Sequence, residues 1–339
     1  MEYLSALQKR ILLFIEGCSD ETFESLLLEV HAFQSAHNPV ISAFSSSFPT
    51  PISWKTIPAI PQEAFREFRV AAFPKGKSIR VFHTSGTTGS KLGKHWFYSL
   101  ELYEKAVRNG WQRVGLAGYP IFALLPSPQI APYSSLVQMA SWITPEENFF
   151  WGENSWRRLQ RFISNTPVLL FGTALAFLGF FATTPPLILP TGSLAVETGG
   201  YKGRRVEISK LEFYKLFEQH LGLPSTAIFN EYGMAELSSQ FYASGIRTPH
   251  QAPPWARALV IDPETQKECA LNGTGMLRLF DLANLGSACV LQTRDLAIRR
   301  ENGFELLGRD LSAVPQGCSR AIDGTHAIKV SFYEDGRNC

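Results

Sequence analysis

Short apolar runs alternate with helix-like stretches along most of this chain. At the start, apolar residues recur every three or four positions in 4–16 and 23–33, which predicts two amphipathic helices. Further on, short apolar runs that end at proline, glycine or polar residues are typical of buried parallel strands. Strands are predicted at 78–82, 121–125, 168–171, 187–189 and 226–229, and helices at 99–114, 156–163, 174–181, 210–221 and in the stretch ending at 142. The alternation predicts an α/β fold whose mostly parallel sheets are flanked by helices.

The last part of the chain has a pattern typical of hairpins. Residues 273–284 predict a hairpin edge followed by a strand, and the turn Asn302-Gly303 predicts a second hairpin between strands at 291–298 and 305–309. Near the start, 38–61 is rich in proline, serine and isolated aromatic residues, which predicts a long surface loop. Residues 63–70 predict one short helix before the strand at 78–82.

Composition narrows the functional class only a little. The chain has 339 residues, 45% of them hydrophobic, which is enough for one large domain or two. Its 32 basic and 30 acidic residues leave a formal charge of +2, which gives no reason to expect nucleic acid or an anionic membrane as the main partner. A balanced charge suits an enzyme that acts on small molecules but does not identify one.

Cysteine usage and hydropathy predict a cytoplasmic protein without a transmembrane segment. The five cysteines are odd in number, widely spaced and form no C-x-x-C pair, which argues against a disulfide framework and a zinc ribbon. The N-terminus shows no signal-peptide pattern. Residues 162–196 carry no charge, but Pro167, Pro185, Pro186 and Pro190 divide this stretch into pieces too short to span a bilayer.

The stretch from His83 to Lys91 has the composition of a phosphate-binding loop. It follows an extended run and combines Gly86 and Gly89 with several hydroxyl residues and a lysine. Glycines let the main chain fold tightly so that its N–H groups converge on an anion, and Lys91 adds a positive charge. The spacing is not that of a Walker A loop, and an ordinary Ser/Thr/Gly turn is the alternative.

Two later stretches have features of a nucleotide and metal site. Residues 196–203 are a strand end that opens into glycines, where bare main chain can lie flat against a planar ligand. Residues 230–237 pair Tyr232, which can stack on a base, with Glu236, whose carboxylate can hold a divalent cation. The alternative for this pair is a core aromatic residue and a solvated acid.

Taken in order, three motifs resemble those of the adenylate-forming (ANL) superfamily. They are 84–89 (TSGTTG), 231–236 (EYGMAE) and 293–296 (TRDL) followed by Gly308-Arg309. Within the superfamily, the chain is most similar to acyl-protein synthetases of the LuxE type. This narrower resemblance rests on 125–128 with 134–136, on 197–203 and 280–285, and on a lysine that follows Thr88-Gly89-Ser90 without the proline of typical ligases. The resemblance covers about residues 80–320.

The resemblance implies a site for ATP and Mg²⁺. The residues implied for the β- and γ-phosphates are Thr84, Ser85, Gly86, Thr87, Thr88, Gly89 and Lys91. Gly199 and Gly200 would line the adenine and Tyr232 would stack on it, with Glu231 and Gly233 in the same nucleotide-binding motif. Glu236 would bind Mg²⁺, Asp295 would hold the ribose hydroxyls, and Arg309 would lie nearby at a hinge.

The resemblance also implies domains and a reaction. Residues 1–308 would form the adenylate-forming domain, with 1–75 as a helical and loop entry segment, and 309–339 would form a short C-terminal hinge and remnant subdomain. A fatty carboxylate would attack the α-phosphorus of ATP and pyrophosphate would leave. Mg²⁺ held by Glu236, together with Lys91 and the N–H groups of the loop, would neutralise the negative charge, and the acyl adenylate would then be open to a thiol.

Two departures from the superfamily pattern bear on activity. The usual threonine before the metal-binding glutamate is Ala235, so a hydrogen bond to the α-phosphate is lost unless Ser238 or Ser239 supplies it. Only 30 residues follow Arg309, whereas typical ligases have a longer domain with a catalytic lysine. LuxE-type proteins carry an acyl-accepting cysteine in this region, and Cys318 matches it best. A buried inert cysteine and the terminal Cys339 are the alternatives.

Three functions stay open from the sequence. The first is an acyl-protein synthetase that transfers the acyl group to its own cysteine as a thioester. The second is a ligase that transfers it to coenzyme A or a carrier protein, as phenylacetate-type ligases do. The third is a nucleotide-binding scaffold, with little catalysis of its own, for a partner acyl reductase.

Overall fold

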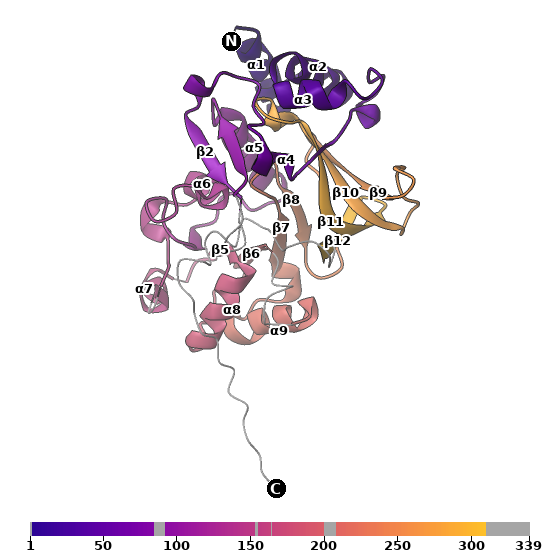
Figure 1. Ribbon diagram of the computed structural model, residues 1–339. Coiled ribbons are helices and arrows are strands. Elements are labelled where there is room, and N and C mark those ends of the chain that lie inside the picture. Colours follow the sequence, from indigo (N-terminus) through magenta and orange to yellow (C-terminus); the bar gives the residue numbers. More distant parts are fainter. Residues whose placement is uncertain (1, 85–91, 153–154, 164, 200–207, 310–339) are drawn as a thin grey trace.

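The computed structural model describes residues 2–84, 92–152, 155–163, 165–199 and 208–309. Helices at the N-terminus pack against a mostly antiparallel sheet, and a mostly parallel sheet lies beside it with helices on both faces (Figure 1). The described helices are α1 (Glu2–Glu16), α2 (Phe23–His37), α3 (Pro39–Ser45), α4 (Ala64–Glu67), α5 (Glu101–Arg113), α6 (Ser135–Ile143), α7 (Ser155–Phe162), α8 (Ala174–Thr183) and α9 (Lys210–Leu221).

The parallel sheet has the strand order β4-β5-β6-β7-β8. Its strands are β4 (Ile121–Leu124), β5 (Leu169–Thr173), β6 (Leu194–Thr198), β7 (Ile228–Tyr232) and β8 (Phe241–Ser244), of which only β8 is antiparallel to its neighbour. Neighbouring residues of β5 enter different cores. Leu170 packs with residues of α8 and α9, whereas Leu169 and Phe171 pack with residues of α5 and α6. The predicted parallel sheet between two helical layers is therefore confirmed.

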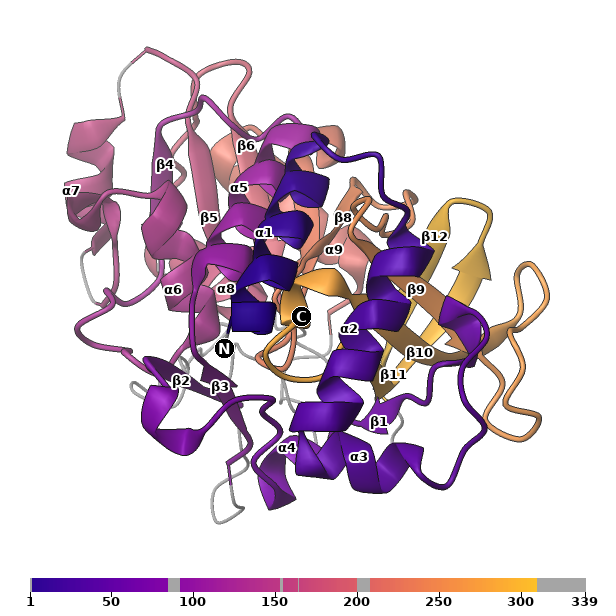
Figure 2. The ribbon, with the colours of Figure 1, turned by 90° about the horizontal axis from the view of Figure 1, so that it is seen from above.

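The second sheet has the order β1-β11-β10-β9, with β12 also paired to β11. Its strands are β1 (Ile60–Pro61), β9 (Ala256–Ile261), β10 (Thr274–Asp281), β11 (Val290–Arg300) and β12 (Gly303–Arg309). Only β1 pairs in parallel, and the hairpin predicted at Asn302-Gly303 joins β11 to β12. Figure 2 shows α1 alongside α5 and α2 beside this sheet, and the buried side chains of α1, α2 and β10 share one core.

The predicted loop at 38–61 is wrong over its first part, where α3 forms. Asn38 ends α2 and begins α3, because its side chain accepts a hydrogen bond from the backbone N–H of Val40 at 3.1 Å. Pro39 then occupies the first helical turn, where a missing N–H costs nothing. The Asn-Pro pair is thus a helix start, although proline content alone favoured a loop.

The strand predicted at 187–189 is also wrong. Residues 187–189 are extended but do not join the sheet, because their N–H groups donate to the C-terminal end of α9. Leu187 donates to the carbonyl of His220 at 2.7 Å and Leu189 to that of Leu221 at 2.9 Å. The strand that follows α8 in the sheet is β6, which pairs with β5. In the described part of the chain, no helix is both long and apolar enough to cross a membrane.

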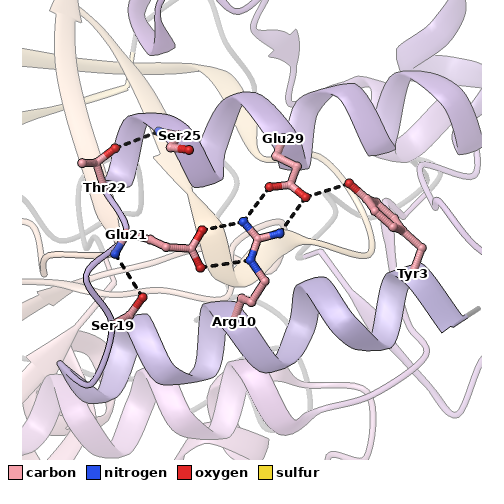
Figure 3. A network of polar contacts seen from close by, with 7 residues as sticks. All are labelled: Tyr3, Arg10, Ser19, Glu21, Thr22, Ser25 and Glu29. Atoms are coloured by element: carbon pink, nitrogen blue, oxygen red, sulfur yellow. Dashed lines mark hydrogen bonds and ion pairs between the residues drawn. The ribbon is translucent and has the colours of Figure 1, made fainter.

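A network of polar side chains joins α1 to α2 (Figure 3). The guanidinium of Arg10 donates to Glu21 at 2.9 Å and, through its two terminal nitrogens, to Glu29 at 2.7 Å. The hydroxyl of Tyr3 donates to Glu29 at 2.7 Å, and Thr22 caps α2 by accepting from the N–H of Ser25 at 3.1 Å. Arg10 lowers the pKa of both carboxyls through these bonds.

We expect Arg10→Met to lower the free energy of unfolding at pH 7 by about 1 kcal/mol, since the pairs are partly exposed. The two carboxyls have lowered pKa values in the folded state, so this stabilisation is lost as the pH falls from 4.5 through those values. Urea unfolding at pH 7 and pH 3 measures the effect. Arg108→Met, which breaks one exposed pair with Glu104 on α5, is the matched control, and an equal loss in both variants would contradict the prediction.

Candidate active site

The candidate site lies where β6 and β7 end, at the carboxyl edge of the parallel sheet. β6 runs into Gly199, which has a φ of +77°, and β7 ends directly before Gly233. The strand register pairs Glu197 with Asn230, and Thr198 with Glu231. Successive side chains of a strand point to opposite faces, so each pair occupies its own face of the sheet. Ligands of open α/β sheets bind at this edge.

On one face, the predicted nucleotide residue Glu231 is held by Thr198. The hydroxyl of Thr198 donates to the Glu231 carboxyl, and both side chains are buried. Burial raises the pKa of Glu231 to about 7. A Cβ added at Gly233 would lie 2.4 Å from Glu231 Oε1, so only glycine leaves room for this carboxyl. The Glu231 carboxyl and Gly233 therefore lie in direct contact, and their nucleotide-binding role stays a prediction.

The opposite face carries a buried polar network that the sequence did not predict. Glu197 Oε1 accepts from Asn230 Nδ2 at 2.7 Å and from the hydroxyl of Tyr214 at 3.1 Å. Asn230 Oδ1 lies 2.6 Å from His250 Nε2. Since the amide nitrogen of Asn230 faces the carboxyl, its oxygen is the acceptor and His250 carries its proton on Nε2. The network ties α9, β6 and β7 to the segment before β9.

Burial shifts both ends of this network toward the neutral form. It raises the pKa of Glu197 to about 7 and lowers the pKa of His250 to about 3. The ring of His250 stacks on Phe304 of β12 at 5.1 Å between centroids. Glu197 stands in the sequence only within the LuxE-like motif. His250 stands in no motif, so no local sequence pattern indicates its place in this network.

The structure brings Tyr232 and Asp295 together from positions 63 residues apart. The hydroxyl of Tyr232 donates to Asp295 Oδ2 at 2.7 Å. Asp295 also pairs through the backbone with Arg309, so all three implied residues lie at the same end of the β11–β12 hairpin. The ring of Tyr232 packs against Phe241 and Phe304 and is 7% exposed, which leaves little of its face open to a base. Its stacking role stays a prediction.

Ala235 and Glu236 are linked to the strand pair β2 (Arg80–His83) and β3 (Lys94–Phe97). His95 of β3 is buried, and its Nδ1 lies 2.7 Å from the carbonyl oxygen of Ala235. A carbonyl only accepts, so Nδ1 is the donor. Burial lowers the pKa of His95 to about 4, which keeps the ring neutral. The backbone oxygen of Glu236 accepts from Asn284 Nδ2 at 2.7 Å, so the main chain is held on both sides of this residue pair.

Neither Ser238 nor Ser239 can supply the hydrogen bond that Ala235 lacks. The hydroxyl of Ser238 donates to Asn284 Oδ1 at 2.7 Å, and that of Ser239 donates to Asp281 Oδ1 at 2.6 Å. Both serines are buried, and a hydroxyl has one proton to donate. In this structure the two side chains therefore hold the main chain after Glu236 in place, and neither has a hydroxyl proton left to donate to an α-phosphate.

Thr84 forms the described stem of the predicted phosphate loop. Its N–H donates to the carbonyl of Gly93 at 2.9 Å, and its hydroxyl accepts from the N–H of Gly93 at 2.8 Å. A Cβ at Gly93 would lie 2.8 Å from Thr84 Oγ1, so the close approach requires glycine. Thr84 and Gly93 thus hold the two ends of the loop together as β2 leads into it and β3 leaves it.

Several predicted site residues lie outside the described part of the chain. These are Ser85, Gly86, Thr87, Thr88, Gly89, Lys91, Gly200, Cys318 and Cys339. Among the described residues, no group of three or more His, Cys, Asp or Glu side chains could hold a metal ion. Mg²⁺ is often held by one or two carboxylates together with substrate phosphates, which is compatible with Glu236 as a ligand. The donor set fits a metal that arrives with a nucleotide.

The buried carboxyls at this edge predict a stability that falls with pH. A carboxyl whose folded pKa is raised to about 7 stabilises the fold fully below the unfolded value of 4.5, and this contribution is lost as the pH rises through 7. Glu197→Gln removes one of the two titrations. We expect the stability of the variant relative to the original to increase by about 2–3 kcal/mol between pH 4.5 and pH 8.

Urea unfolding over this pH range measures the difference. Glu301→Gln, at an exposed turn position, is the control and should follow the original protein at every pH. Curves for Glu197→Gln that run parallel to the original across the range would contradict a buried, titrating Glu197.

Comparisons with known proteins identify the fold. No family model and no curated protein matches the sequence. Solved structures do match: 2-hydroxyisobutyryl-CoA ligase in complex with 2-HIB-AMP and CoA superposes with a TM-score of 0.64 at 14% identity, covering 85% of this chain and 74% of that one. McyG A-PCP complexed with phenylalanyl-adenylate gives 0.51 at 15% identity, with 70% and 48% covered.

A third match is ATP-bound MatB from Rhodopseudomonas palustris, with a TM-score of 0.50 and 15% identity over 68% of this chain. The chain spans about half the length of the MatB chain, 47%. At these identities the likeness concerns the fold alone, and it agrees with the sheets and helical layers described above. The chain therefore shares its α/β fold with these three proteins.

Proposed function

We propose that this protein uses ATP to activate a carboxylic acid as an acyl adenylate, with release of pyrophosphate. The observation that carries the proposal is the hydrogen bond between Tyr232 and Asp295, at 2.7 Å. It joins two motifs that are distant in sequence, at the sheet edge where ligands of such folds bind. The link from His95 to Ala235 adds support, because it connects the phosphate-loop strands to the residue before Glu236.

The proposed reaction is an in-line displacement. A carboxylate oxygen of the acid attacks the α-phosphorus of ATP, and the bond to the pyrophosphate oxygen breaks. Thr84 to Lys91 would hold the β- and γ-phosphates, and Tyr232 with Asp295 would orient the nucleoside. Glu236 would hold Mg²⁺, which when bound offsets the negative charge of the phosphates. Ala235 would contribute no hydroxyl to the α-phosphate.

The second half-reaction would be thioester formation. A thiolate sulfur attacks the acyl carbon of the adenylate, and AMP leaves with the bonding electrons. The finer proposal is that the acid is a long-chain fatty acid and that the thiol is Cys318. The neighbouring Arg320 would favour the thiolate. The resemblance to LuxE-type synthetases supports this acceptor.

Two alternatives have their own support. The complex of 2-hydroxyisobutyryl-CoA ligase with CoA favours coenzyme A as the acceptor, and a carrier protein would use the same chemistry. The loss of the threonine hydroxyl at Ala235, with Ser238 and Ser239 both occupied, favours a weakly active nucleotide-binding scaffold, with an acyl reductase as its partner.

Carboxylate-dependent exchange of labelled pyrophosphate into ATP tests the proposal. Exchange with a fatty acid supports the activating enzyme, and ATP binding without exchange on any carboxylate favours the scaffold. Labelled fatty acid with ATP and Mg²⁺ should then give a hydroxylamine-sensitive band in denaturing electrophoresis. Cys318→Ala should lose the band and Cys339→Ala should keep it. Product that forms only with added coenzyme A would assign the ligase instead.

A further inference from the structure

Arg66 of α4 lies against the stem of the predicted phosphate loop. Next to it, the ring of Phe65 packs edge-on against His95 of β3 at 5.5 Å between centroids, which places α4 on this strand. A Cβ at Gly93 would lie 3.3 Å from Arg66 Cγ and 2.8 Å from Thr84 Oγ1. The aliphatic part of Arg66 and the side chain of Thr84 therefore both lie close to Gly93.

The guanidinium of Arg66 has an unsatisfied buried nitrogen. Its Nη2 is inaccessible to solvent and has no hydrogen-bond partner in the structure. A buried N–H of a charged group without an acceptor is destabilising, so native structures rarely keep one without a reason. Gln62 Oε1, an acceptor on the same segment, is also buried without a partner, so the two groups do not satisfy each other.

Arg69, three residues later, has a different environment. Its Nη1 donates to the carbonyl of Phe73 at 2.8 Å. Its Nε and Nη2 are also buried without a hydrogen-bond partner, but the guanidinium lies 5.0 Å from the ring centroid of Phe73 and 5.5 Å from that of Trp96. Cation–π contacts stabilise a guanidinium without an anion. Arg66 has no such aromatic contact among those described. Its position beside Thr84 indicates that the missing hydrogen-bond acceptor is a phosphate.

We infer that Arg66 binds the polyphosphate anion of the nucleotide, and of the pyrophosphate product, from beside the Thr84–Gly93 stem. The inference rests on the proposed function, to which it adds a binding residue outside the motifs. A guanidinium donates two parallel hydrogen bonds to a phosphate, which would satisfy the nitrogen that has no partner. Lys94 and His83 lie on the strands of the same stem and add no negative charge.

Calorimetric titration with inorganic pyrophosphate, ATP and adenosine tests the inference. Arg66→Gln should weaken pyrophosphate and ATP at least about tenfold and leave adenosine unchanged, because a charge-assisted bond is lost only with the phosphates. Arg66→Met keeps the aliphatic stem beside Gly93 and is the second uncharged variant. Arg66→Lys should be intermediate. Arg69→Gln is the matched control and should stay within about twofold of the original.

Two results would overturn the inference. One is unchanged pyrophosphate affinity in a folded Arg66→Gln or Arg66→Met variant, and the other is an equal loss for adenosine, which would mean a structural role. The proposed reaction fails separately. An original protein that binds pyrophosphate through Arg66 but shows no carboxylate-dependent exchange would refute acid activation and leave this site in place.

Discussion

Gly303→Ala should lower the free energy of unfolding by about 3–5 kcal/mol. Gly303 has a φ of +132°, a region that other residues rarely occupy, and an added Cβ would lie 2.0 Å from the carbonyl oxygen of His250. That carbonyl accepts from the N–H of Phe304, and the N–H of His250 donates back to Phe304 at 2.8 Å. The methyl group would therefore break the contact between β12 and the His250 segment. Urea unfolding measures the loss.

Gly118→Ala separates the two causes of this effect. Gly118 also has a positive φ, +92°, but nothing lies within 4 Å of an added Cβ. Backbone strain alone should cost about 1–2 kcal/mol there. If Gly303→Ala and Gly118→Ala lower the free energy of unfolding equally, the added methyl group does not clash with the carbonyl of His250. The close contact between Gly303 and His250 would then be incorrect.

Glu236→Gln should reduce carboxylate-dependent pyrophosphate exchange by about a hundredfold or more and raise the Mg²⁺ concentration for half-maximal exchange. The amide keeps the shape of the side chain but removes the negative charge that would hold the ion. The hydrogen bond from Asn284 to the backbone oxygen of residue 236 does not involve this side chain and is unaffected. Initial rates over a range of Mg²⁺ concentrations measure both effects.

Glu236→Asp and Glu268→Gln sharpen this test. The aspartate keeps the charge on a shorter arm and should recover part of the rate. Glu268 lies far from β7 in sequence and forms surface ion pairs with Lys55 at 2.9 Å and Arg299 at 3.1 Å. Its isosteric amide should leave exchange within about twofold. Mg²⁺ dependence that is the same in Glu236→Gln and the original protein would remove Glu236 from the metal site.

The parallel sheet could be predicted because its strands are apolar on both faces and end at glycine or proline. The same rule failed at 187–189, since periodicity cannot distinguish a strand from an extended segment that bonds to the end of α9. No strand is predicted from the sequence at β3, β8 or β9, and of these β3 contains both polar and aromatic residues. Asn38-Pro39 misled in the other direction, because a helix start and a loop share the same residues.

The residues of the site likewise divide into those that stand in sequence motifs and those that do not. Tyr232, Asp295, Glu231 and Gly233 stand in motifs, and the structure brings Tyr232 close to Asp295 and Gly233 close to the carboxyl of Glu231. The residues that hold them were not predicted, because each acts through a partner far along the chain. His95 reaches Ala235 across 140 positions, and His250 reaches Asn230 from a segment without any motif. Burial and orientation, which decide such roles, are absent from a local pattern.

The pairing of β12 with β11 limits how far Cys318 can lie from the proposed ribose site. Arg309, the last residue that the structure describes, pairs with Asp295, whose carboxylate would hold the ribose. Cys318 stands nine positions after Arg309 in the sequence, and a chain of that length reaches at most about 30 Å. A thiol within that reach would have an effective concentration on the order of millimolar at the proposed adenylate. A free thiol in solution would have to exceed that concentration to compete.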